Sequence, residues 1–115
     1  MSNHNHSTMR QTLKCRDVIS VGDSWFRYED NYVDDGQREV LIVTPRTNNP
    51  KGPVWLKPHL ARSGDRVEIF KNVFITFTDI SKKSRIRLMI EADKSIPITK
   101  GYPYERNLKL IHSNS

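Results

Sequence analysis

The stretch from residue 64 to residue 100, GDRVEIFKNVFITFTDISKKSRIRLMIEADKSIPITK, decides the fold class. Apolar and polar side chains alternate in three runs within it, at 66–69, 73–78 and 85–91. Alternation with a period of two is what a β-sheet with one buried face requires. The polar run 81–84 separates the second run from the third and predicts a hairpin connection. The stretch therefore predicts an antiparallel sheet.

A shorter strand is expected at 95–100, and it contains Pro97. Proline has no N–H to donate to a strand ladder, so this strand should lie at an edge or pair on one side only. Beyond it, a brief helix is expected over residues 104–111. Two helical turns are marginal alone, so this helix would need to dock on the sheet.

A second pair of strands is predicted upstream, at 24–28 and 39–43, because Asp35-Gly36 between them is a hairpin-turn dipeptide. The residues up to Thr12 offer little to bury and are expected to be a disordered start. Trp25 and Trp55 are expected to pack inside the N-terminal layer. Together these patterns predict a mainly β protein, a small antiparallel β domain with a short C-terminal helix.

Composition narrows the class of protein further. A chain of 115 residues has room for one domain. The single cysteine, Cys15, cannot form an internal disulfide, and the sequence does not cluster metal ligands around it. No apolar run is long enough to span a membrane as a helix. We therefore expect a cytoplasmic protein without a metal or cofactor.

The charge of the chain is unevenly distributed. Up to Glu39 there are five Lys or Arg against seven Asp or Glu, and from Val40 onward there are fourteen against six. A surplus of this size attracts polyanions, of which nucleic acid is the most abundant. Membrane binding would need a basic amphipathic helix, which the pattern does not contain.

Five short segments follow one another in an order that resembles a known family. They are Gly64-Asp65, residues 73–77 (VFITF), 86–93 (IRLMIEAD), 96–100 (IPITK) and 104–106 (YER). This order and spacing are similar to the carbon storage regulator family, small bacterial translational regulators that bind messenger RNA. The resemblance implies an interleaved homodimer, with each RNA site formed by the first strand of one subunit and the last strand of the other.

The resemblance also assigns candidate RNA-binding residues. On the last strand, Lys100 stands where the family has its key arginine, and Ile98 takes the apolar position two residues before it. Lysine has a compact charge where arginine has a planar fork, which implies weaker or less base-selective binding. Arg87 would add positive charge.

Two registers compete for the first strand of the family. The first places Val43 and Arg46 on that strand and makes residues 47–63 an inserted loop. The second runs without a gap and retains Arg62, but it puts Pro58 inside a strand, which proline tolerates only at an edge. We favour the first register.

These expectations combine into one functional interpretation. Residues 1–12 would be a disordered tail, 13–39 an acidic N-terminal extension, and 40–115 the RNA-binding domain. The protein would occupy GGA-containing hairpin loops of messenger RNA near translation starts and repress translation or alter mRNA stability. Small regulatory RNAs are expected as further partners, whereas DNA and membranes are not.

An enzyme is not expected. Asp34 and Asp35 are adjacent, so on a strand their side chains would point to opposite faces and make a poor acid–base pair. His59 has no serine or cysteine partner that spacing would identify. The alternative is a non-catalytic protein-interaction module, a relative with weakened RNA binding that uses its acidic segment to bind another protein.

Overall fold

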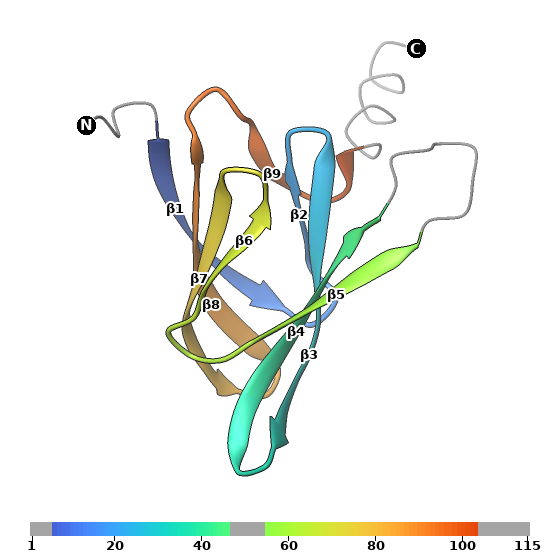
Figure 1. Cartoon of the computed structure of the whole chain (residues 1–115), viewed down its shortest axis with the longest axis vertical. Coiled ribbons are helices and arrows are strands. Elements are labelled where there is room, and N and C mark those ends of the chain that lie inside the picture. Colours follow the sequence, from blue (N-terminus) through green and yellow to red (C-terminus); the bar gives the residue numbers. More distant parts are fainter. Residues whose placement is uncertain (1–5, 47–54, 104–115) are drawn as a thin grey trace.

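The computed structural model describes residues 6–46 and 55–103, and these form nine strands in two sheets (Figure 1). The strands are β1 (His6–Lys14), β2 (Val18–Val21), β3 (Ser24–Asp34), β4 (Gln37–Pro45), β5 (Leu56–Ala61), β6 (Arg66–Phe70), β7 (Val73–Lys82), β8 (Arg85–Asp93) and β9 (Ile98–Lys100). Every pairing between them is antiparallel. The prediction of a small antiparallel β domain is confirmed.

The two sheets exchange strands between distant parts of the chain. One sheet has the order β1-β8-β7-β6, and the other has the order β5-β4-β3-β2-β9. In Figure 1 the four-stranded sheet lies on the left and the five-stranded sheet on the right. The strand nearest the N-terminus thus joins the sheet built from the second half of the chain, while β5 and β9 join the sheet built from the first half.

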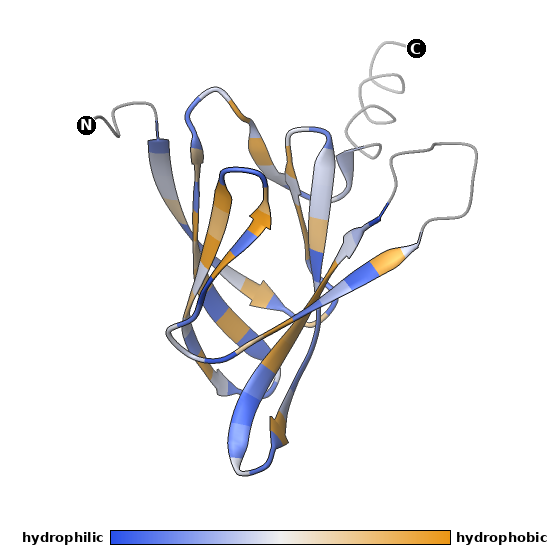
Figure 2. Cartoon of the chain, viewed as in Figure 1, coloured by the Kyte–Doolittle hydropathy of each residue, from blue (hydrophilic) through white to orange (hydrophobic). Residues whose placement is uncertain are grey.

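The core lies between the sheets and follows from the alternation. Inward-facing residues of β7 and β8, such as Ile75, Phe77 and Leu88, are buried, while their neighbours in sequence face outward. Phe26, Tyr28 and Ile42 do the same from the five-stranded sheet. Figure 2 shows the resulting hydrophobic and hydrophilic bands along the strands.

Both predicted hairpins are present. Asp35 and Gly36 connect β3 to β4, each with a positive φ (52° and 76°), as a two-residue hairpin turn requires. Between β7 and β8 the turn falls at Lys83-Ser84, inside the polar run that predicted it.

Pro58 and Pro97 lie where their missing N–H is harmless. Pro58 is in β5, which is an edge strand of the five-stranded sheet. Pro97 immediately precedes β9, the opposite edge strand, which pairs only with β2. The prediction that the Pro97 strand lies at an edge is confirmed.

Three predicted segment boundaries are wrong. Residues 6–12 are not disordered but belong to β1, because hydrogen bonding to β8 satisfies their backbone and Met9 and Leu13 face the core. Residues 13–39 are not a separate extension, since β2 and β3 lie within the five-stranded sheet. Of the expected loop 47–63, residues 56–61 form β5.

The expectations for the two tryptophans and for the C-terminal helix remain to be compared with the structure. Trp25 is half-buried on the outer face of its sheet, but Trp55 is 65% exposed and does not pack in the core. The predicted helix at 104–111 lies outside the described residues. In the described part of the chain, no helix is long and apolar enough to cross a membrane.

Candidate nucleic-acid interface

Four cations gather on the outer face of the β1–β8 ladder. Odd-numbered positions of β1 face the core, so Arg10 and Lys14 point outward. In the strand pairing, Lys14 lies opposite Arg85, Thr12 opposite Arg87 and Arg10 opposite Met89. Directly opposed residues of an antiparallel pair share one face, with Cβ atoms about 5 Å apart. We call the surface formed by Arg10, Lys14, Arg85 and Arg87 the basic face.

The charge of the basic face is poorly compensated. Within residues 6–46 and 55–103, none of its four cations forms an ion pair within 4.0 Å. The nearby Asp79 carboxylate is held by the N–H and hydroxyl of Ser81, which lower its pKa together with Arg87 and Lys82. Like charges held opposite each other repel, so an anion bound between them would relieve that repulsion.

Arg66, on the outer face of the same sheet, differs from the cations of the basic face because it has an ion-pair partner. Its guanidinium pairs with Glu91 at 3.0 Å and lies 3.8 Å from the centre of the Phe74 ring. This arginine is occupied by neighbours in its own sheet. Among the described residues, no cation of the basic face has such an ion pair; the acid opposite Arg87, Asp79, makes its hydrogen bonds with Ser81.

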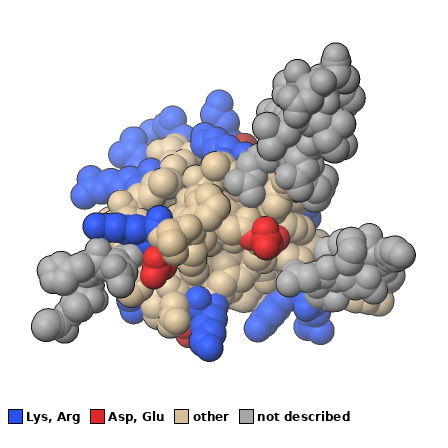
Figure 3. Space-filling model, turned by 90° about the horizontal axis from the view of Figure 1, so that it is seen from above, with Lys and Arg blue, Asp and Glu red and all other residues tan. Residues whose placement is uncertain are grey.

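The basic face is also hollowed. A depression of about 500 Å³ is lined by Arg10, Thr12, Thr78, Arg87 and Met89, together with Gln11 and Leu88. Guanidinium and hydroxyl groups can bind phosphate, and a thioether offers apolar contact to a base. Seen from above, Lys and Arg side chains project around the rim of the molecule (Figure 3).

Within one chain, the residues predicted for the RNA site lie on several strands; the predicted site is shared between two chains and stays a prediction. Arg87 is part of the basic face. Lys100 is exposed at the end of β9, while Ile98 on the same strand packs against the core. Val43 is only 6% exposed, which makes it a packing residue. Because β4 and β9 are separated by β3 and β2, Val43 and Lys100 do not share a strand pair.

The two competing registers can be compared with the fold. The register through Arg46 treats β4 as the strand before Gly64, but β5 occupies that place. The gap-free register, with Pro58 in an edge strand, matches the observed strand order. Its arginine, Arg62, is engaged with Glu39 at 3.7 Å, whereas Arg46 is exposed beyond the end of β4. Which register applies stays a prediction, because both registers depend on the resemblance.

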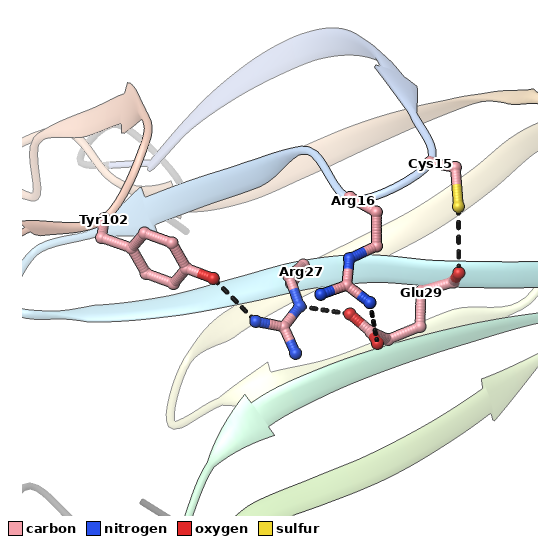
Figure 4. A network of polar contacts seen from close by, with 5 residues as sticks. All are labelled: Cys15, Arg16, Arg27, Glu29 and Tyr102. Carbon is pink, nitrogen blue, oxygen red and sulfur yellow. Dashed lines mark hydrogen bonds and ion pairs between the residues drawn. The ribbon is translucent and has the colours of Figure 1, made fainter.

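A separate polar network lies on the five-stranded sheet (Figure 4). Arg27 forms an ion pair with Glu29 and donates a hydrogen bond to the Tyr102 hydroxyl at 2.7 Å. Arg16 also pairs with Glu29, at 3.4 Å, and the thiol of Cys15 donates to its carbonyl. Burial alone would lower the pKa of Arg27, but these hydrogen bonds outweigh it and raise that pKa. The network joins the turn before β2, β3 and the segment after β9, so it serves the fold.

Sequence reasoning missed Arg10 and Lys14. Both lie in the stretch expected to be disordered or part of a separate extension, so their charge was not placed on a surface. The alternation of Thr8, Arg10 and Thr12 with apolar or amide side chains could have indicated a strand. Its partner, β8, could not be inferred because it lies far along the chain.

The comparisons leave the family open. No family model matches the chain, and neither the curated proteins nor the solved structures contain a match. Among the described residues, no group of three or more His, Cys, Asp or Glu side chains could hold a metal ion.

Proposed function

We propose that the protein is a post-transcriptional regulator that binds messenger RNA through the basic face. The observation that carries the proposal is the set of four cations on two adjacent strands without an ion-pair partner among the described residues. Unpaired RNA exposes both phosphates and base edges, and a sheet surface with cationic and apolar groups can bind both.

The selectivity of the proposed binding comes from the resemblance noted above. It implies GGA-containing hairpin loops near translation starts, where the bound protein would block the ribosome or alter mRNA stability. Messenger RNA and small regulatory RNA are the proposed partners, in the cytoplasm. Lys100 would contribute a contact from β9, outside the basic face.

The test is an equilibrium titration by fluorescence anisotropy with three RNAs. One is a hairpin with GGA in its loop, the second has the same stem with an altered loop, and the third is a blunt duplex. We expect affinity to fall in that order, and Lys100→Ala should weaken binding to the first RNA. Equal affinity for all three would contradict loop selectivity, and failure to bind any would contradict the function itself.

The control for Arg87→Ala is a variant that removes one positive charge elsewhere, so that both variants have the same total charge. Lys71 lies in the turn between β6 and β7, at the end of the four-stranded sheet remote from Lys14 and Arg85. Lys71→Ala removes one charge without touching the basic face, so it should bind RNA as the wild type does. Arg87→Ala should bind more weakly.

A second candidate function is protein binding, and a different surface favours it. The outer side of β5 presents Leu56 and Leu60, which are 38% and 55% exposed, to solvent. Exposed apolar side chains in a row are typical of protein contacts. Leu60→Glu separates the two functions, because it should abolish such a contact and leave the affinity for RNA unchanged.

A further inference from the structure

The two halves of the chain have similar strand pairing, apart from a bulge in β6–β7 between Glu68 and Phe70 that β2–β3 lacks. The hairpin β2–β3 pairs Ile19 with Phe26, and β6–β7 pairs Val67 with Ile75. The next hairpins, β3–β4 and β7–β8, each contain a bulge at a corresponding place, directly after Tyr28 in one and Phe77 in the other. Strands β1–β4 and β5–β8 thus follow one plan.

The match extends to individual hydrogen bonds. The Asp17 N–H donates to the Lys14 carbonyl at 2.9 Å, and the Asp65 N–H donates to the Arg62 carbonyl at 3.0 Å. Each aspartate also accepts a bond through its side chain, from the Lys14 N–H at 2.9 Å and the Arg62 N–H at 2.8 Å.

Two more bonds fix the turn to the sheet in each half. The Tyr28 N–H donates to the Asp17 carbonyl, and the Phe77 N–H donates to the Asp65 carbonyl, both at 3.0 Å. The preceding residue donates back, from Arg16 to Tyr28 at 2.8 Å and from Gly64 to Phe77 at 2.7 Å. Arg16 and Gly64 both have positive φ, 79° and 87°, although this region is costly for arginine.

Each half donates its first strand to the other. Strand β1 pairs with β8, placing Leu13 opposite Ile86, and β5 pairs with β4, placing Ala61 opposite Val40. All four of these side chains are buried. Such a reciprocal exchange is the relation between two subunits of a two-fold symmetric dimer, here within one chain.

The corresponding outer faces have different chemistry. On the first strands, Leu13 corresponds to Ala61, so Arg10 corresponds to Pro58 and Lys14 to Arg62. On the last strands, Ile86 corresponds to Val40, so Arg85 corresponds to Glu39 and Arg87 to Leu41. Two cations of the basic face are therefore matched by apolar residues and a third by an acid. The remaining cation, Lys14, is matched by Arg62, which is paired with that acid, Glu39.

We infer that the chain is a tandem duplication that folds as a pseudo-dimer and binds one RNA per chain. The duplication is inferred from strand pairing and hydrogen bonds alone. That the ligand of the single site is RNA rests on the proposed function. The face corresponding to the basic face lacks the charge that would bind a second RNA.

The duplication is tested by cutting the chain between its halves. A protease site is inserted between β4 and β5, and the cut protein is examined by native mass spectrometry with the uncut chain beside it. We expect the uncut protein at the mass of one chain and the two fragments still associated, separating only in denaturant. Fragments that separate in native buffer, or an uncut protein at twice the mass, would overturn the pseudo-dimer.

The single site is tested by titration at concentrations well above the dissociation constant, with the GGA hairpin as the probe. We expect one tightly bound RNA per chain for the wild type and no tightly bound RNA for Arg10→Ala/Arg87→Ala, which should show only the weaker binding. The control Pro58→Ala/Leu41→Ala changes the corresponding positions of the other half and should still bind one RNA.

The titration also separates the two proposals. Two RNAs per wild-type chain, or half the capacity left in the arginine variant, would overturn the single site. Fragments that stay associated while no RNA binds would contradict the proposed function and the site, but would leave the duplication standing.

Discussion

Asn31 is a buried polar side chain that ties the two sheets together. It is 1% exposed, and its amide donates to the carbonyls of Ile80 and Lys82, both at 2.9 Å, on the opposite sheet. Its own oxygen accepts a hydrogen bond from Arg38 at 3.0 Å. Burial of an amide is tolerated here because its hydrogen-bonding groups have partners.

We predict that Asn31→Ala lowers the free energy of unfolding by about 1–3 kcal/mol, because it leaves two carbonyls without their donor. Urea denaturation monitored by tryptophan fluorescence measures this change. Val33→Ala, on the same strand but exposed, is the control and should stay within about 0.5 kcal/mol of the wild type. Equal stability of the two variants would show that Asn31 does not join the sheets.

His59 makes stability depend on pH. Its Nε2 lies 2.9 Å from the Thr44 hydroxyl, and burial together with the neighbouring Lys57 lowers the pKa of His59 below its ordinary value. As the pH falls, the unfolded chain therefore takes up the proton before the folded one does. The stability is fully present above about pH 6.5 and declines from there toward the folded-state pKa.

The expected result is a lower free energy of unfolding at pH 5.5 than at pH 7.5. Glutamine does not titrate and can still bond to Thr44, so His59→Gln should flatten this dependence. Denaturant titrations of both proteins at the two pH values provide the measurement. An unchanged pH dependence in His59→Gln would assign the effect to another group.

At the scale of elements, β1 stabilises the fold, although most of it was expected to be a disordered tail. Leu13 is fully buried against the opposite sheet, so Leu13→Ala should cost about 2–5 kcal/mol of stability. Thr12→Ala removes a neighbouring side chain that faces solvent and serves as the control. Thermal unfolding of both variants compares them, and a Leu13→Ala protein as stable as the control would mean that β1 is not docked.

The hairpins were predictable from sequence because their determinants are local. Asp35-Gly36 sets its own turn, and the alternating runs of β7 and β8 are adjacent in the chain. Strands β1 and β5 were not predicted, and each was missed for its own local reason. One is an edge strand whose inner face includes the polar Ser7 and Gln11, and the other contains Pro58.

At the scale of the whole molecule, the resemblance placed strand exchange between two subunits, whereas the described structure has it within one chain. Local sequence patterns do not encode which distant strands will pair. The same limit hid the basic face, since Arg10 and Arg87 meet only through the β1–β8 ladder. Arg87 was predictable as a charged residue, but the surface to which it belongs was not.

Two acids of the acidic stretch form ion pairs within the five-stranded sheet. Glu29 pairs with Arg27 and Arg16, and Glu39 pairs with Arg62, so these acids neutralise cations of their own sheet. No corresponding pairs cover the basic face within the described residues. The surplus of positive charge is thereby concentrated on the four-stranded sheet.

The salt dependence of RNA affinity tests the basic face most directly. For the GGA hairpin, the logarithm of the association constant should fall linearly with the logarithm of salt concentration, by about 0.7 per phosphate contact. We predict that Arg10→Ala/Arg87→Ala weakens binding and reduces this slope by about 1.4, for two lost contacts at about 0.7 each, whereas Lys71→Ala leaves it unchanged. A slope near zero, or an identical slope in the double variant, would contradict RNA binding by the basic face.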